Sequence, residues 1–403
     1  MESVDYLIVG GGISGLFMGY LLQRNGFKCK ILERDLSLEG RSQGFSLTIQ
    51  GETQKIFKKY GLLDEMYENG CATNQKVFLD SDGKVLHKSP MQNFNYPLPR
   101  QKLRQMFYSK LSAETVCWNK KVDRIVTNFG FIPRIFVSCT DGSEYICNVL
   151  LACDGINSKV REHYLPEIGL RNFGMINVYG VVDLDEMHPS EKEFFKNNTI
   201  QILDGTSRLF TKPFDNKMQM WELTYCDNVA NDIPQDLATQ KRGSEPLCED
   251  LASASRGSEP LCENRAKKFA LEITKKWNLP AVFNAIKSTN DKDIIVHPLF
   301  DHEPTLEEVM SLPLSNIILA GDAIHPMAPS IGMGANEAFS DCECFVNLLI
   351  EHDGDIRKVS KDYYHNMVER TSKSVSRSRS NMEFYHTNDA TDVDKLSKFK
   401  KWN

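Results

Sequence analysis

Short apolar runs alternate with segments of helical spacing at the start of the chain. Residues 4–9 form an apolar run followed by glycines, which is typical of a strand buried on both faces of a parallel sheet. Apolar side chains recur at helical spacing over residues 14–24, and Gly26 stands where the helix would end in a left-handed conformation. Residues 28–32 then alternate as a second strand. Together these segments predict a βαβ unit of about thirty residues, the length that a right-handed crossover requires.

Further strands are expected in two hairpin-like stretches and in a longer aromatic region. Residues 76–86 surround a turn at 81–83, and residues 122–145 surround a turn at 140–143, so both stretches predict antiparallel additions. Residues 172–225 combine strand-like runs with aromatic side chains, which suits a half-buried, substrate-facing sheet.

The second half of the chain predicts a helix at 264–277, a buried strand at 317–320 and a basic, serine-rich helix at 359–380. We interpret the charges of the last helix as a solvated face rather than a binding patch. Residues 242–263 contain the sequence Arg-Gly-Ser-Glu-Pro-Leu-Cys-Glu twice. Because two copies cannot stack into a solenoid, this segment is expected to be an inserted, exposed loop.

Composition places the chain among globular proteins. Its 403 residues are 41% hydrophobic, enough for a packed core and, at roughly 100–200 residues per domain, for two or three domains. No run approaches the roughly 20 apolar residues of a membrane span, so no integral membrane segment is expected. A net charge of -6 without a concentrated basic surface gives no reason to expect a nucleic-acid partner.

Cysteine usage and the first residues bear on the compartment. The 11 cysteines are an odd number without a CxxC pair, so we interpret them as mostly buried thiols in a reducing compartment. His297 and His302 flank a proline-containing loop at a spacing that suits a metal poorly, and no metal is expected. The first residues carry an acidic side chain at position 2 and then an apolar run, without the basic region of a secretory signal, which predicts a cytoplasmic protein.

A glycine-rich turn lies directly between the first predicted strand and helix, with the sequence Gly10-Gly11-Gly12-Ile13-Ser14-Gly15. It fits the pattern GxGxxG, in which Gly10 permits a tight turn, Gly12 lets backbone approach a pyrophosphate and Gly15 lets the helix pack closely. The unpaired N–H groups of the helix start attract anions. Glu33 ends the second strand, where a carboxylate can accept hydrogen bonds from ribose hydroxyls. This arrangement predicts a dinucleotide site without separating FAD from NAD.

Two later segments also place a turn after a buried strand. In the first, over residues 150–161, the turn is Asp154-Gly155 and Arg161 follows at helical spacing. In the second, over residues 316–336, the turn is Gly321-Asp322, followed by a loop with Pro329 and by a second glycine-rich helix start, Gly332-Met333-Gly334.

With the Arg-x-x-Leu element at Arg100, these motifs resemble the single-component FAD-dependent aromatic hydroxylases, the family of para-hydroxybenzoate hydroxylase, salicylate hydroxylase and the tetracycline-modifying monooxygenases. The resemblance covers nearly the whole chain. It implies an α/β fold in which a three-layer, Rossmann-like FAD-binding domain with a mostly parallel sheet is interleaved with a mixed-sheet substrate domain and followed by a C-terminal helix. The expected FAD-binding domain comprises residues 1–72, 97–171 and 298–352, the substrate domain 73–96 and 172–297, and the C-terminal helical segment 353–403.

The resemblance also implies roles for individual residues. Asp322 would accept hydrogen bonds from the ribityl hydroxyls, and the helix start at 332–334 would face the flavin pyrimidine. Arg100 would reach the FAD phosphate or ribityl region, with an exposed surface arginine as the alternative. Asp154 and Arg161 would lie near the diphosphate and the nicotinamide approach, with ion-pair scaffolding as the alternative. The full expected cofactor-binding set is Gly10, Gly12, Ile13, Ser14, Gly15, Glu33, Arg34, Arg41, Arg100, Asp154, Gly155, Arg161, Gly321, Asp322, Pro329, Gly332, Met333, Gly334 and Asn336.

The chemistry implied by the resemblance is a monooxygenation. NADPH or NADH, as a transient co-substrate, would reduce FAD, dioxygen would add at C4a, and the resulting hydroperoxide would hydroxylate or epoxidise a small aromatic or conjugated substrate. Neither an acid/base residue nor the oligomeric state follows from the sequence. Two alternatives stay open: an FAD-dependent reductase or dehydrogenase of isoprenoid-like substrates, and a non-catalytic flavin-binding redox sensor.

Overall fold

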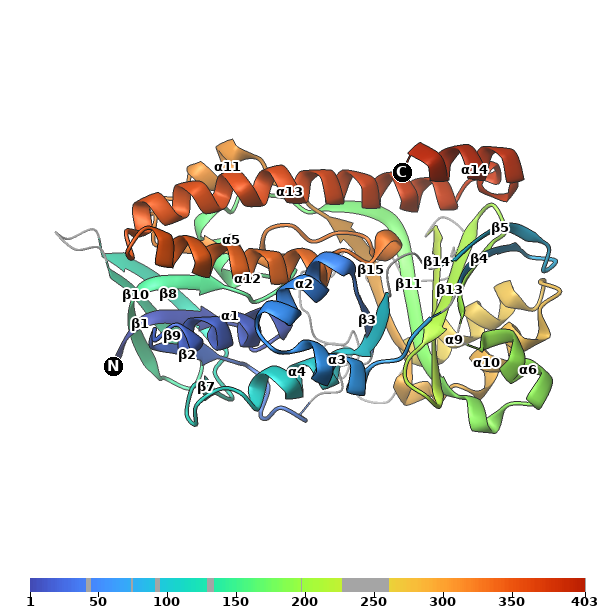
Figure 1. Cartoon of the computed structure of the whole chain (residues 1–403), viewed down its shortest axis with the longest axis horizontal. Coiled ribbons are helices and arrows are strands. Elements are labelled where there is room, and N and C mark those ends of the chain that lie inside the picture. The colour runs from blue at the N-terminus through green and yellow to red at the C-terminus, as the bar shows by residue number, and fades with distance from the viewer. Residues whose placement is uncertain are drawn as a thin grey trace.

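The computed structural model describes residues 1–40, 45–73, 75–90, 95–128, 134–196, 198–226 and 261–402. Within them the chain forms two large sheets bridged by one long helix (Figure 1). Arg41 and residues 242–260 of the repeat lie outside the described residues, and residues 261–263 begin a helix.

The first sheet contains the expected βαβ unit. Its strand order is β7 (Val116–Cys117), β2 (Cys29–Leu32), β1 (Glu2–Val9), β10 (Glu144–Ala152), β9 (Arg134–Cys139) and β8 (Val122–Asn128), and β16 (Ile317–Leu319) also pairs with β10. Strands β7, β2, β1, β10 and β16 are parallel, whereas β8 and β9 are antiparallel additions. The α/β class and the mostly parallel sheet expected from the sequence are confirmed.

Helices of the first sheet meet in an aromatic cluster. Phe17 of α1 (Ile13–Arg24) lies 5.0 Å, between ring centroids, from Phe107 of α4 (Arg100–Tyr108) and 5.2 Å from Phe339 of α12 (Gly334–Glu351). Phe57 of α2 (Gly51–Lys59) completes the cluster. Because α1 is buried on all sides from Ile13 to Leu22, it is held firmly between the sheet and the other helices. The remaining short elements here are β3 (Ser46–Ile49) paired with β6 (Tyr96–Pro99), α3 (Leu63–Asn69), α5 (Lys159–Tyr164), α11 (Leu306–Met310), η4 (Gly321–Ala323) and η5 (Pro329–Ile331).

The second sheet is mixed and has two different faces. Its order is β15 (Ile295–Asp301), β11 (Arg171–Asp183), β14 (Met218–Cys226), β13 (Ser207–Pro213), β12 (Asn198–Leu203), β4 (Gln75–Asp80) and β5 (Val85–Pro90), and only β12 and β4 pair in parallel. One face carries apolar residues such as Val178, Leu209 and Trp221 and packs against helices α6 (Pro189–Phe195), α9 (Leu261–Thr274) and α10 (Pro280–Ser288). Since side chains alternate between faces, the polar residues Asn177, Gln201 and Glu222 lie on the opposite face.

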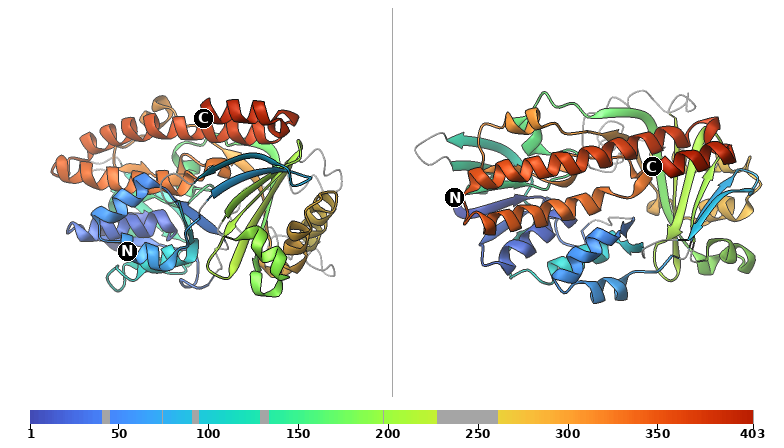
Figure 2. Two further views of the ribbon diagram at one scale, coloured as in Figure 1. Left: turned by 45° about the vertical axis from the view of Figure 1, so that its right-hand side comes forward. Right: turned by 45° about the horizontal axis from the view of Figure 1, so that its top comes forward.

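Helix α13 (Ile356–Tyr385) runs along both sheets, and α14 (Val393–Trp402) folds back beside its end (Figure 2). Helix α13 is longer than the helix expected at 359–380, because buried residues continue at helical spacing to Tyr385. Its charges do not all lie on a solvated face, which corrects the sequence interpretation: Arg370 and Arg379 turn inward to the carboxylates of Asp341 and Asp301. The other short helices are η1 (Leu184–Glu186), η3 (Asp291–Asp293) and η6 (Asn388–Thr391). Among the described helices none has the length and apolarity to cross a membrane.

Candidate functional site

Three turns that are distant in sequence meet at one edge of the first sheet. Strand β10 lies between β1 and β16 in parallel register, with Val9 opposite Ala152 and Ala152 opposite Leu319. The carboxyl ends of parallel strands share an edge, so the turns that follow, at Gly10, Asp154 and Gly321, are neighbours there. This edge is where ligands bind in open α/β sheets.

The three glycines of the first turn have different surroundings. Gly10 has φ +101° and lies against the carbonyl of Cys153, and Gly15 packs on the carbonyl of Gly10, so neither position has room for a Cβ. A Cβ at Gly12 would meet only Nη2 of Arg100, at 3.8 Å. Packing within the chain therefore requires two of the glycines, whereas Gly12 leaves open space beside a guanidinium group.

One carboxylate and one arginine hold the glycine turn at Gly11. Glu33 is 5% exposed, and its Oε2 accepts a hydrogen bond from the N–H of Gly11 at 2.5 Å. Arg104 is fully buried and donates from Nε to the carbonyl of Gly11 at 3.3 Å and from Nη1 to that of Leu38 at 3.1 Å. Sequence reasoning missed Arg104, although its position one turn after Arg100 on α4 is a signal for a shared helix face. Arg34 follows Glu33 and is half-buried.

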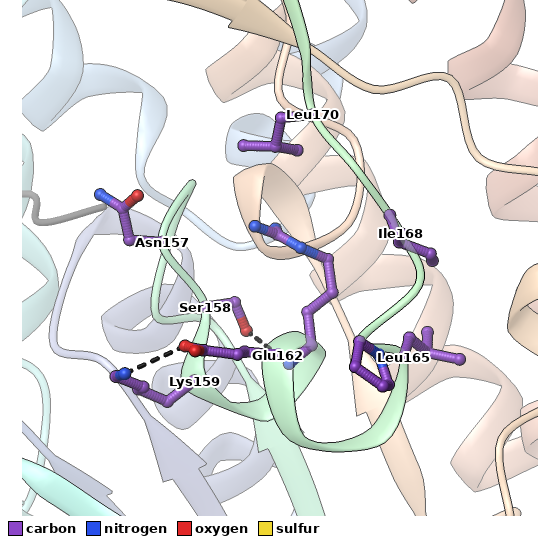
Figure 3. Close-up of a pocket in the computed structure, with 9 residues that line it drawn as sticks. Asn157, Ser158, Lys159, Glu162, Leu165, Ile168 and Leu170 are labelled. Atoms are coloured by element: carbon purple, nitrogen blue, oxygen red, sulfur yellow. Dashed lines mark hydrogen bonds and ion pairs between the residues drawn. The ribbon is translucent and has the colours of Figure 1, made fainter. Parts of the chain in front are cut away.

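Arg161 joins the second turn to the third. Its guanidinium is 7% exposed and donates to the carbonyls of Ile156 at 2.5 Å and Ala323 at 2.7 Å. Asp154 accepts a hydrogen bond from the N–H of Lys159 at 2.7 Å, and burial raises the pKa of its carboxyl group. The cavity beside Arg161 is only about 30 Å³ and is lined by residues such as Asn157, Lys159 and Leu165 (Figure 3). This volume is close to the share of liquid volume that one water molecule takes.

A buried charge network lies behind the Gly321-Asp322 turn. Oδ2 of Asp341 accepts a hydrogen bond from the N–H of Gly321 at 2.8 Å and lies 2.6 Å from Nε2 of His325, while Nη2 of Arg370 reaches Oδ1 at 2.6 Å. Burial opposes ionisation of Asp341, but the charges of His325 and Arg370 outweigh it and lower its pKa. Burial likewise disfavours the charged form of His325, but Asp341 raises its pKa. The carboxylate of Asp322 itself is exposed.

The loop after this turn is fixed to strand β3. Gly332, in a left-handed conformation with φ +67°, closes the 3-10 helix that begins at Pro329, and Met333 precedes the first residue of α12. Asn336 is 3% exposed, donates to the carbonyls of Thr48 at 2.9 Å and Gly332 at 2.8 Å, and accepts from the N–H of Gln50 at 2.9 Å. The start of α12, at Gly334, thus has a fixed position beside the carboxylate of Asp322.

Lys212, in strand β13 of the second sheet, also contacts strand β3. It is 4% exposed, and its Nζ donates to the hydroxyl of Thr48 at 2.8 Å. Burial lowers the pKa of Lys212 to about 7, although Glu222 acts in the opposite direction. Sequence reasoning missed this lysine because Thr48 is 164 residues away and no local pattern marks the contact.

The cysteines whose side chains the structure describes are free thiols: Cys29, Cys71, Cys117, Cys139, Cys147, Cys153, Cys226, Cys342 and Cys344. No group of three or more His, Cys, Asp or Glu side chains suited to a metal ion occurs among the residues that the structure describes. Of the sequence-predicted residues, Gly10 to Gly15, Asp154, Gly155, Gly321 and Asp322 form the three turns, Glu33, Arg100 and Arg161 contact or lie beside them, and Pro329 to Asn336 form the loop and helix start that follow the third turn. Arg34 follows Glu33, and Arg41 lies outside the described residues.

Comparisons with known proteins agree with this geometry. A family model described as FAD binding domain matches residues 3–235. Monooxygenase 2 of Arabidopsis thaliana is 26% identical, with 84% of this chain and 75% of that protein aligned. The aurachin C monooxygenase/isomerase of Stigmatella aurantiaca is 23% identical, over 85% of this chain and 80% of its own length. Among solved structures, Klebsiella pneumoniae HpxO complexed with FAD and uric acid has a TM-score of 0.75 at 17% identity and covers 99% of this chain and 92% of its own, which shows a shared fold.

Proposed function

Because this chain belongs to the FAD binding domain family, whose model matches residues 3–235, we propose that it is an FAD-dependent monooxygenase, an oxidoreductase acting on a small aromatic or conjugated molecule. The observation that carries the proposal is the meeting of the turns at Gly10, Asp154 and Gly321 at one sheet edge. A long dinucleotide needs contacts from separated segments, and this edge supplies them.

The residues at this edge fit FAD. The open space at Gly12, beside the guanidinium of Arg100, suits a pyrophosphate, because a side chain there would occupy the approach to the backbone. The exposed carboxylate of Asp322 suits the ribityl hydroxyls, and the N-terminus of α12 offers N–H groups to negative charge on the reduced ring. When bound, FAD supplies the redox chemistry, accepting a hydride from NADPH or NADH and activating dioxygen.

Other residues position these groups. Arg104 and Arg161 fix the backbone of the turns, and Asn336 fixes the loop that precedes α12. Lys212 lies at the junction of the second sheet and β3, on the side where we place the substrate. With a pKa of about 7, its ammonium group can release or take up a proton near neutral pH. We propose that it faces the substrate.

An oxygen-labelling experiment tests the proposal. Purified protein is expected to be yellow with bound FAD, and NAD(P)H should bleach the flavin band faster when a substrate from an aromatic and polyketide panel is present. Product formed under labelled dioxygen should carry one labelled oxygen atom.

Other results would contradict the proposal or indicate a different function. A colourless protein that refuses FAD on reconstitution overturns the proposal. Turnover without label in the product indicates a reductase or dehydrogenase. Bound FAD with background NAD(P)H oxidation across the whole panel indicates a redox sensor.

A further inference from the structure

The polar face of the second sheet gathers cations beneath the two C-terminal helices. Register places Gln201 of β12 opposite Phe78 of β4 and Phe210 of β13 on this face. Lys76 and Arg208 stand two residues before Phe78 and Phe210 on their strands, and therefore share the face. Figure 1 shows α14 and the end of α13 beside strands β4 and β5.

Lys400 of α14 is directed at the same place. Its Nζ donates to the hydroxyl of Tyr385 and lies 4.9 Å from the ring centroid of Phe78 and 4.7 Å from that of Tyr385. Lys76 lies 5.3 Å from the ring of Phe78, and Arg208 lies 5.8 Å from the ring of Tyr385. Aromatic faces attract cations, but they carry no net charge to balance them.

The cations here repel one another. Burial lowers the pKa of Lys400 to about 6, and Lys76, Arg208 and Arg377 add to that effect. Burial also lowers the pKa of Lys76 to about 8, with Arg208 and Arg377 as the further causes. Around these two lysines, every described charged group that shifts the pKa is therefore another cation.

Three further polar groups belong to the surroundings. His87 of β5 lies opposite Phe78, with 5.9 Å between ring centroids, and burial, together with Lys400 and Lys76, lowers its pKa. Glu222 forms an ion pair with Arg208, with 3.3 Å between Oε1 of Glu222 and Nη1 of Arg208. Gln201 is fully buried and accepts from Nε of Arg208 at 2.9 Å, but its Nε2 donor has no partner among the described residues. A buried donor without a partner costs about 1–3 kcal/mol, so this amide is aimed at an acceptor still to be supplied.

We propose that Lys76, Gln201, Arg208 and Lys400 form a binding site for an anionic oxygen group, a carboxylate or a phosphate. Such a group would accept hydrogen bonds from the amide of Gln201 and the ammonium groups, and would supply the negative charge that the cations lack. It would arrive either on the organic substrate or as a free small anion. The site goes beyond the proposed oxygenation and is tested by binding rather than by turnover.

Calorimetry with inorganic phosphate and with benzoate tests the site in the FAD-loaded full chain. Chloride is varied to keep the ionic strength constant, and two buffers of different ionisation enthalpy report the protons exchanged. At pH 7.5 we expect at least one of the two anions to bind with uptake of about one proton, because binding restores the charged form of Lys400. The substitutions Lys400→Met and Lys76→Met should weaken that binding at least tenfold, whereas Lys400→Arg should retain it.

Lys395→Met is the matched control, since Lys395 lies on the same helix but is exposed and paired with Asp389 at 2.6 Å. It should bind the anion as the parent protein does. Lys400→Met should not lower the melting temperature without anion, because it removes a repelling cation. A lower melting temperature would mean a purely structural lysine and would overturn the site.

The two probes also separate the sources of the anion. Benzoate binding that alters the visible spectrum of FAD supports a carboxylate carried by the substrate, whereas phosphate binding without a spectral change supports a free anion. The proposal is overturned if neither anion binds more tightly than chloride, or if both methionine variants bind as the parent does. Failure of FAD binding would instead contradict the proposed function.

Discussion

Asp341 connects the Gly321-Asp322 turn to helix α13 through a single carboxylate. Its Oδ2 accepts a hydrogen bond from the N–H of Gly321 and contacts Nε2 of His325, and its Oδ1 accepts one from the guanidinium of Arg370. Asp341 and His325 are fully buried, so water cannot replace a lost partner. The position of the Gly321-Asp322 turn thus depends on a buried residue that lies behind it.

The substitution Asp341→Asn should lower the free energy of unfolding by about 3–5 kcal/mol, because it leaves the fully buried imidazolium of His325 without its counter-charge, whereas Arg370 keeps its ion pair with Glu337. The loss should depend on pH. His325 has a raised pKa, so its contribution is complete below 6.5, its ordinary value, and fades as the pH rises through the raised value. Asp341 has a lowered pKa, so its contribution is present above 3.8, its ordinary value, and fades as the pH falls through the lowered value. Urea unfolding of both proteins across roughly pH 4 to 9 measures the difference, and covers the range in which the contribution of His325 fades.

Asp362→Asn serves as the control, because Asp362 pairs with His352 at 2.8 Å on the surface. Exposed pairs contribute about 0–1 kcal/mol, so this variant should remain close to the parent protein. Equal losses from the two substitutions would contradict the role given to the buried network.

At the scale of elements, two glycines in the turn between β1 and α1 have different roles: packing requires Gly15, and we expect Gly12 to serve FAD binding. Gly15→Ala should destabilise the protein, because its Cβ would run into the carbonyl of Gly10. Gly12→Ala should leave the melting temperature of the FAD-free protein nearly unchanged, since its Cβ has only Nη2 of Arg100 at 3.8 Å. It should nevertheless weaken FAD binding at least tenfold, as measured by titration of the apoprotein with FAD. Unchanged FAD affinity would show that the cofactor does not approach the chain at Gly12.

The elements themselves were largely predictable, whereas the contacts behind them were not. The βαβ unit and the three turns follow from local patterns of apolar residues and glycines, and the structure places them as expected. Arg104, Lys212 and Asp341 act on segments brought near by the fold, and the contact of Lys212 with Thr48 spans 164 residues. The inward arginines of α13 could not be separated from solvated ones, because a basic helix face has the same sequence pattern in both cases.

At the scale of the whole molecule, α13 fastens the two sheets together. In the first half of α13, the hydroxyl of Tyr363 donates to the carbonyl of Leu319 at 2.8 Å. The hydroxyl of Tyr364 donates to the carbonyl of Ile317 at 3.0 Å, and both carbonyls belong to the first sheet. Beyond the end of α13, Nε2 of His386 lies 3.1 Å from the carbonyl oxygen of Thr224 on the second sheet. One helix thus shares its contacts between both cores.

We therefore expect the protein to unfold in one transition, with circular dichroism and tryptophan fluorescence changing together in urea. Ser376→Pro, at an exposed position inside α13, should cost about 3 kcal/mol or more and separate the two signals, because it breaks the helix between the sheets. Ser376→Ala should keep a single transition. Coincident signals in the proline variant would mean that the sheets are coupled by other contacts.

The late position of β16 also governs the order of events during synthesis. Strand β10 ends at Ala152, but its partner β16 begins only at Ile317, after all the strands of the second sheet have been made. Until then β10 presents an unpaired edge on the ribosome, the kind of surface on which nascent chains aggregate. The cofactor edge therefore cannot exist in any shorter product of interrupted translation, and a cell gains a competent protein only from chains extended past that strand.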